Sequence, residues 1–179
     1  MKFTSFKNWL FERATEKLSY GCLMLDTDIP DWKEKISIVD KDDVYEEDND
    51  YGYEKEPHIT ILYGFHDDKI NKKDLYEEIK KLHPITLTID NISIFDDDNN
   101  YDVVKFDVPV TKELKEYRKI FLKFPNTQTF NKYHPHMTIC YCIKGAGHKY
   151  VKKVQPFSVT FDTAIYSSPN EDKQIFDLK

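Results

Sequence analysis

The heptapeptide PHITILY at residues 57–63 returns as PHMTICY at residues 135–141, with five of the seven positions identical. Short apolar runs rich in β-branched and aromatic residues are typical of β-strands. Side chains two positions apart in a strand point to the same face, so His58 and Thr60 are expected to lie side by side. The sequence therefore predicts two strands that each present an imidazole beside a hydroxyl.

The second copy places His136 and Thr138 in the same relation. A single His-x-Thr triplet arises readily by chance, and a histidine on an apolar strand is most often a hydrogen-bonded core residue. The matching proline, isoleucine and tyrosine around both triplets argue against chance. The side chains of opposite parity are expected to face the core: Ile59, Ile61, Tyr63, Met137, Ile139 and Tyr141.

Two imidazoles and two hydroxyls around one site suit the cleavage of a phosphodiester. That reaction needs a base for the attacking oxygen, an acid for the leaving oxygen and hydrogen-bond donors for the non-bridging oxygens. Histidine performs either proton transfer near neutral pH. We expect His58 and His136 to be the acid and the base, in an order that the sequence leaves open, with Thr60 and Thr138 as donors and with no metal or cofactor.

A metal site is the other chemical interpretation of the second motif, because His134, His136, Cys140 and Cys142 share one strand parity. Along a continuous strand these side chains spread over more than about 20 Å, at about 3.3 Å per residue. One tetrahedral zinc ion could bind them only if the strand breaks.

The rest of the chain predicts an α+β fold with mainly antiparallel sheet. The acidic segment 40–56 is expected to be a loop that either closes over the site or is simply solvated. The spacing of apolar residues and caps predicts helices over 4–18 and 30–39 and further helices after the N-caps Asn71 and Thr111. Strands are predicted over 20–28, 58–65, 84–95, 101–108 and 136–142. The C-terminal residues 157–179 are predicted to form a hairpin that turns near Pro169 and Asn170.

Length and composition bound the class of protein. A chain of 179 residues with 40% hydrophobic content can form one domain with a real core. The odd count of three cysteines and a polar N-terminal segment predict a reduced, cytoplasmic protein without a signal peptide or membrane partner, located in the host cytoplasm if a phage encodes it. A net charge of −6 disfavours long nucleic acid as a partner but allows a small phosphate ligand. The oligomeric state is left open.

Paired His-x-Thr motifs on strands resemble those of the two-histidine (2H) phosphoesterase superfamily, and the resemblance runs from about Tyr20 to the end of the chain. It implies a bilobal α+β fold of mainly antiparallel sheets around a central cleft, with helices outside. Residues 1–179 would then form a single domain of two pseudo-symmetric lobes, each with one motif. The resemblance also implies metal-independent catalysis by the two histidines and two threonines of the motifs.

Within that superfamily the chain is most similar to the phage anti-CBASS phosphodiesterases, which degrade the cyclic di- and trinucleotides that bacteria use as infection alarms. This similarity implies hydrolysis of the 3′,5′ linkages of a small cyclic oligonucleotide. It is carried by the segments YGCLML (20–25), EPHITILYGFH (56–66), YDVVKFDV (101–108) and YHPHMTICY (133–141).

Four further residues are candidates for substrate binding. Tyr20 could stack on a base, because every base offers a π face, and it could equally be an ordinary strand aromatic. Lys132 and Tyr133 could reach a phosphate, and Glu171 could accept from a base N–H or be a solvated turn carboxylate. Three rival functions remain: an RNA-processing 2H enzyme acting on 2′,5′-oligoadenylate or 2′,3′-cyclic phosphate ends, a sponge that binds cyclic nucleotides without cleaving them, and a structural protein with chance motifs.

Overall fold

Two four-stranded antiparallel sheets form the frame of the protein. The computed structural model describes residues 20–46, 51–95, 100–128 and 132–179, so the helix predicted over 4–18 lies outside it. The first sheet has the order β2-β1-β7-β8 and the second the order β5-β4-β3-β6. The strands are β1 (Tyr20–Asp26), β2 (His58–His66), β3 (Ile85–Phe95), β4 (Tyr101–Asp107), β5 (His136–Ile143), β6 (Lys152–Phe161), β7 (Thr163–Ser167) and β8 (Lys173–Asp177).

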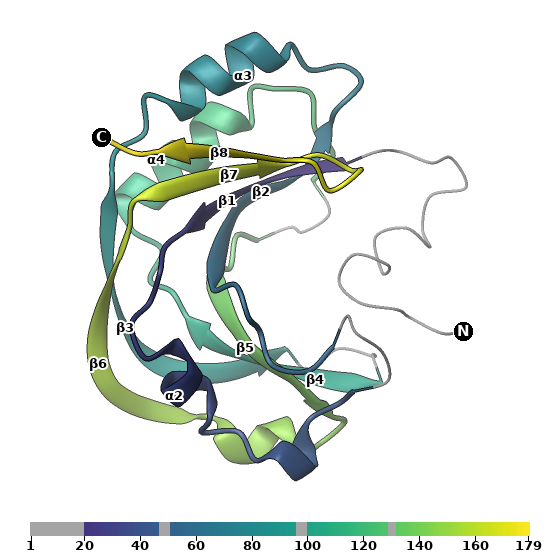
Figure 1. The fold of residues 1–179 in the computed structure, drawn as a ribbon, viewed down its shortest axis with the longest axis vertical. Coiled ribbons are helices and arrows are strands. Elements are labelled where there is room, and N and C mark those ends of the chain that lie inside the picture. Colours follow the sequence, from purple (N-terminus) through teal and green to yellow (C-terminus); the bar gives the residue numbers. More distant parts are fainter. Residues whose placement is uncertain (1–19, 47–50, 96–99, 129–131) are drawn as a thin grey trace.

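Three α-helices and two 3₁₀ turns accompany the sheets within the described residues. They are α2 (Trp32–Ile36), α3 (Lys72–Ile79), α4 (Lys112–Phe121), η1 (Lys41–Asp43) and η2 (Gly147–Tyr150). In Figure 1, α3 lies above the first sheet and α4 lies behind β7 and β8, while α2 and η2 lie near the second sheet. The α+β architecture with antiparallel sheets is confirmed. The central cleft and the division into two lobes stay predictions.

The predicted caps and apolar stripes position α3 and α4. Asn71 accepts a hydrogen bond from the Lys73 amide, and Thr111 accepts one from the Leu114 amide, so both predicted N-caps are confirmed. Each helix then buries one face against the core: Leu75 and Ile79 of α3, and Leu114 and Phe121 of α4. Across the described residues, no helix is long and apolar enough to cross a bilayer.

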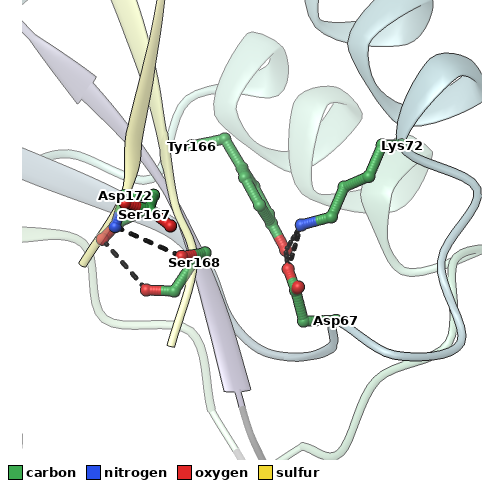
Figure 2. A network of polar contacts seen from close by, with 6 residues as sticks. All are labelled: Asp67, Lys72, Tyr166, Ser167, Ser168 and Asp172. Carbon is green, nitrogen blue, oxygen red and sulfur yellow. Dashed lines mark hydrogen bonds and ion pairs between the residues drawn. The ribbon is translucent and has the colours of Figure 1, made fainter. Parts of the chain in front are cut away.

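A partly buried polar network fixes α3 and the preceding loop to the first sheet. Tyr166 of β7 is 1% exposed, and its hydroxyl donates to the Asp67 carboxylate at 2.5 Å. Lys72, at the start of α3, pairs with the same carboxylate and lies over the Tyr166 ring (Figure 2). The network ties the end of β2 to β7 across β1.

The C-terminal third differs from the predicted hairpin at its start. β7 and β8 do form a hairpin, with backbone hydrogen bonds between Ser168 and residues 171 and 172 closing the turn. Figure 2 shows Ser168 beside Asp172 in this turn. Residues 157–161, however, belong to β6, which pairs with β3 in the other sheet. The chain crosses from one sheet to the other at Asp162, and the alternating pattern on either side carries no signal of that change.

Candidate functional site

The two motif strands meet where the sheets adjoin. β2 is the edge strand of the first sheet, β5 is the edge strand of the second, and the two strands contact each other (Figure 1). A hydrogen bond crosses this seam, because the Tyr133 hydroxyl donates to the Thr60 carbonyl oxygen at 3.2 Å. The chain thereby brings its two His-x-Thr motifs together from distant parts of the sequence.

Matching β-bulges give both motif strands the same irregularity. Ile61 in β2 and Ile139 in β5 are extra residues without a direct partner on the neighbouring strand. A bulge shifts the alternation by one, so Leu62 and Cys140 are buried where strict alternation would expose them. The prediction that Tyr63 and Tyr141 face the core is wrong for this reason: both tyrosines are partly exposed.

The segment ahead of each motif strand runs along the other motif strand. Residues 44–45 and 52–54 cover the free edge of β5, through hydrogen bonds that include Tyr45 N–H to Tyr141 C=O and Glu54 N–H to Ile139 C=O, both at 2.9 Å. Residues 125–127 cover the free edge of β2 in the same way. We call these two stretches the crossed lead-ins. In the described residues of segment 40–56, this pairing replaces the free lid or solvated loop that the composition suggested.

Both imidazoles are held by the same backbone contact. His58 Nδ1–H donates to the Glu56 carbonyl at 2.9 Å, and His136 Nδ1–H donates to the His134 carbonyl at 2.8 Å. A carbonyl can only accept, so the proton of each neutral ring resides on Nδ1 and Nε2 carries the lone pair. Each ring therefore directs the nitrogen that can exchange a proton away from the backbone.

A carboxylate lies directly across the ladder from each histidine. Asp26 of β1 is the partner of His58, and Asp107 of β4 is the partner of His136. Directly opposite residues in an antiparallel pair share one face of the sheet. Burial raises the pKa of Asp26, although the nearby His58 acts in the opposite direction. The two histidines thus have equivalent acidic neighbours, one in each sheet.

The second carboxylate belongs to a network around a buried cation. Lys105 is 5% exposed and lies opposite Thr138 in the β4–β5 ladder. Its Nζ donates to Asp107 and to Ser93, each at 2.6 Å, and lies 4.4 Å from the centre of the Phe95 ring. Burial opposes ionisation of Asp107, but the donors outweigh it and its pKa is lowered.

The environment of His136 favours the neutral ring. The Phe95 ring packs edge-on against the imidazole at 4.8 Å between centres. Loss of hydration lowers the pKa of His136 to about 4, and the positive charges of Lys105 and of His58 act in the same direction. His58 is therefore close enough for the two rings to influence each other electrostatically. At neutral pH His136 is a proton acceptor.

Thr60 and Thr138 lie beside their histidines, partly exposed on the same faces. The side chain of Thr60 hydrogen-bonds with the Cys22 thiol, whose pKa is raised to about 12 by burial. Thr138 lies opposite Lys105. Each hydroxyl therefore lies on the same face of its sheet as the histidine of its motif.

The four candidate binding residues are spread around this site. Tyr20 shares the face of His58 but lies at the other end of β1, about 20 Å along the strand, with its ring against Tyr63 and His66. Glu171 occupies the β7–β8 turn with a φ of 68°. Tyr133 is half-buried at the seam, next to the exposed Lys132.

The alternative zinc set is divided by the β5 bulge. Cys140 and Cys142 are buried in the core, whereas His136 is on the partly exposed face. Within the described ranges, no three His, Cys, Asp or Glu side chains are grouped to hold a metal ion. The arrangement contradicts the single site formed by His134, His136 and the two cysteines.

Comparison with known families agrees with this geometry. Residues 32–164, which include both motifs, match the 2′-5′ RNA ligase superfamily. The chain belongs to this superfamily of 2H phosphoesterases. Its members are hydrolases, and the two motifs of this chain fall within the matched region. No curated protein sequence matches the chain significantly.

Solved 2H phosphoesterase structures share the fold of this chain at low sequence identity. A structure described as a phosphoesterase has 15% identity and a TM-score of 0.54, covering 90% of this chain and 96% of its own. Escherichia coli LigT in complex with 3′-AMP has 15% identity and a TM-score of 0.56, with 90% and 95% covered. LigT in complex with NADP+ has 14% identity and a TM-score of 0.52, with 90% and 96% covered.

Several site residues of this 2H phosphoesterase were missed by the sequence analysis. Asp26, Lys105 and Asp107 each lie within a strand that was predicted correctly, on the same face as a motif histidine or threonine. A signal for two of them was present, because Lys105 and Asp107 are charged residues of one parity inside the apolar run YDVVKFDV. Arg118, which donates to the bulged Ile61 carbonyl at 2.7 Å, had no such signal on its helix.

Proposed function

We propose that this protein is a metal-independent phosphodiesterase that hydrolyses 3′,5′ linkages of cyclic di- or trinucleotides. The observation that carries the proposal is the matched placement of two His–Thr pairs on contacting strands, each histidine with Nδ1 bonded to the backbone and Nε2 available. The resemblance to the anti-CBASS phosphodiesterases supports the cyclic substrate and a role in evading that bacterial defence. A net charge of −6 agrees with a small ligand.

The two histidines take opposite roles in the proposed reaction. His136, with its depressed pKa, accepts the proton of the attacking oxygen at Nε2. His58, in its protonated form beside Asp26, donates a proton from Nε2 to the leaving oxygen. The attacking oxygen forms a bond to phosphorus as the bond to the leaving oxygen breaks, so one proton is taken up and one is released.

The threonines stabilise the negative charge that accumulates on the non-bridging oxygens. Thr60 and Thr138 donate to the two non-bridging oxygens, and a fixed donor of this kind contributes roughly 10²- to 10³-fold to rate. Lys105 adds positive charge beside Thr138 without leaving its contacts with Asp107 and Ser93. The attacking group is either water or the ribose 2′-OH. The second route passes through a 2′,3′-cyclic phosphate, which a time course of the products detects.

A second candidate is processing of RNA, by action on 2′,5′-oligoadenylate or on 2′,3′-cyclic phosphate ends. The family match and the similarity to LigT structures with 3′-AMP and NADP+ support it, because both ligands are nucleotides. The same acid, base and donors serve this reaction. The two candidates differ in the phosphodiester bond that is cleaved and in how the nucleotide is held.

One substrate panel tests the proposal. Cyclic dinucleotides, cyclic trinucleotides, 2′,5′-oligoadenylate and RNA with 2′,3′-cyclic ends are each incubated with the protein in EDTA, and products are separated by chromatography. Fastest turnover of a cyclic oligonucleotide supports the proposal, and fastest turnover of either RNA substrate supports the second candidate. Activity that EDTA abolishes overturns the metal-independent mechanism.

A further inference from the structure

A cationic groove lies beside the seam, between α4 and the segment that leads into β5. It encloses about 380 Å³, which is within the range of pockets that hold small ligands. Its lining residues are Val110, Lys115, Arg118, Lys119, Leu122, Lys132, Tyr133 and His134. The α4 members recur at three- and four-residue intervals and therefore form one stripe along the helix. We call this feature the α4 groove.

The α4 groove concentrates positive charge that the described part of the chain does not neutralise. Its lining contains four Lys and Arg side chains and no carboxylate. Among the described residues, no Asp or Glu forms an ion pair with Lys115, Lys119 or Lys132, whereas other lysines such as Lys72 and Lys173 do form such pairs. Arg118 bonds to neutral acceptors, the Ile61 carbonyl and the Gln128 side-chain oxygen. On a chain with a net charge of −6, this concentration of cations favours an anionic ligand.

The walls of the α4 groove also contact both motif strands. The Arg118 guanidinium stacks on the Tyr133 ring at 4.6 Å and donates to β2. The Tyr133 hydroxyl donates to Thr60, and the His134 carbonyl accepts from His136. Lys132 lies four residues before His136, so their Cα atoms are at most about 14 Å apart. The groove therefore adjoins both the segment that leads into His136 and the Tyr133 side chain that contacts Thr60.

We propose that the α4 groove binds a second nucleotide of the substrate, with its phosphate on the cationic side chains and its base or ribose on Val110 and Leu122. Those two apolar side chains are 41% and 39% exposed. A nucleotide combines an anionic group with an apolar ring, as the groove combines cations with apolar surface. This inference rests on the proposed phosphodiesterase activity and adds to it a preference for substrates with more than one phosphate.

The experiment reverses two charges that contact neither motif. The variant Lys115→Glu/Lys119→Glu is compared with the control Lys112→Glu/Lys123→Glu, which changes the net charge equally on exposed residues at the ends of the same helix. The first readout is the ratio of kcat/KM for the best cyclic oligonucleotide of the substrate panel to that for the mononucleotide 2′,3′-cyclic AMP. The second is the salt dependence of tetra-adenylate binding to the His58→Ala/His136→Ala protein, with and without the charge reversals.

We expect the groove variant to lower the kcat/KM ratio about tenfold, since exposed charge pairs each contribute modestly to binding. The slope of log affinity against log salt should fall by at least about 1.4, at roughly 0.7 for each phosphate of the single strand that a cation no longer neutralises. Equal slopes and ratios for the groove variant and its control overturn the inference. Poly-glutamate binding is measured as a further control. If the groove variant loses poly-glutamate binding while its salt slope for tetra-adenylate is unchanged, the inference is overturned and the ligand of the groove is an acidic peptide. A protein that cleaves no nucleotide, yet shows the reduced slope, supports the groove and refutes the phosphodiesterase proposal.

Discussion

Replacing Lys105 by methionine tests how the second sheet sets the protonation of His136. Methionine keeps much of the length of the lysine side chain but removes its charge and its hydrogen bonds to Asp107 and Ser93. Lys105 is one of the causes that lower the pKa of His136, so its loss should raise that pKa toward the ordinary value. The pH at which kcat/KM falls on the acid side of its pH profile (the acid limb) should therefore rise by the same amount.

The structure sets the size of the effect. Lys105 Nζ lies 4.4 Å from the Phe95 ring centre, which lies 4.8 Å from the His136 ring centre, so charge and imidazole are at most about 9 Å apart. At an effective dielectric constant of about 20 this interaction is roughly 1.8 kcal/mol, and partial exposure reduces it to about one pKa unit. At pH 4.5 a rise from about 4 to about 5 lowers the neutral fraction from about 75% to about 25%, a threefold loss of activity.

The matched variant for comparison is Asp107→Asn, which removes the negative charge opposite His136 and keeps the size of the Asp107 side chain. Because the Asp107 charge raises the pKa of His136, its removal should move the acid limb below that of the wild-type protein. The assay is kcat/KM from pH 3.5 to 8 with the best substrate of the panel. Both variants break the ion pair between Lys105, which is buried, and Asp107, which is partly exposed. Each variant should therefore lose about 1–2 kcal/mol of folding stability, which is less than the loss expected for breaking a fully buried ion pair.

Only an electrostatic role of Lys105 and Asp107 predicts that the acid limb moves to higher pH in Lys105→Met and to lower pH in Asp107→Asn. If both variants lose stability but leave the limb where the wild-type protein has it, Lys105 serves packing alone and the assignment of His136 as the base loses its support. A limb near 6.5 in the wild-type protein would refute the reasoning directly.

The remaining predictions concern the motifs and the frame around them. His58→Ala and His136→Ala should each lower turnover by roughly 10²- to 10⁴-fold while calorimetry still detects binding of a cyclic nucleotide; unchanged turnover would leave only the sponge or a structural role. The free energy of unfolding should fall as pH decreases from about 6.5 to about 4, because unfolded His136 takes up a proton that the folded ring does not, and His136→Gln should abolish this dependence in denaturant titrations. Gly64→Ala should cost about 2–3 kcal/mol in the same titrations, because Gly64 has a φ of 110° and an added Cβ would overlap the Thr127 carbonyl; a loss below 1 kcal/mol would contradict this. Thr111→Ala should cost about 1 kcal/mol through loss of the α4 cap, and Thr111→Ser should restore most of it.

Local patterns predicted the elements of this fold well. Asn71 and Thr111 cap the helices that they were expected to cap, and the strand over 101–108 is present as β4. Each of these signals lies within a few residues of the element that it specifies. The repeat of PHITILY also predicted two equivalent strands, which the structure brings into contact.

Features that depend on distant partners were not predictable. The bulges at Ile61 and Ile139 arise from pairing with β1 and β4, so neither heptapeptide signals that its tyrosine leaves the core side. The Lys105 network joins β3 to β4, and the α4 groove joins a helix to a loop. In each case the sequence contains the residue, but only the tertiary structure supplies its neighbour.

The crossed lead-ins have a consequence for how the chain tolerates insertions and deletions. Residues 44–45 and 52–54 precede the first histidine in sequence but border the strand of the second, and residues 125–127 do the reverse. Lengthening the chain just ahead of Pro57 would therefore disturb the environment of His136, which is 79 positions away from that proline. Each half of the chain therefore carries the segment that borders the motif strand of the other half.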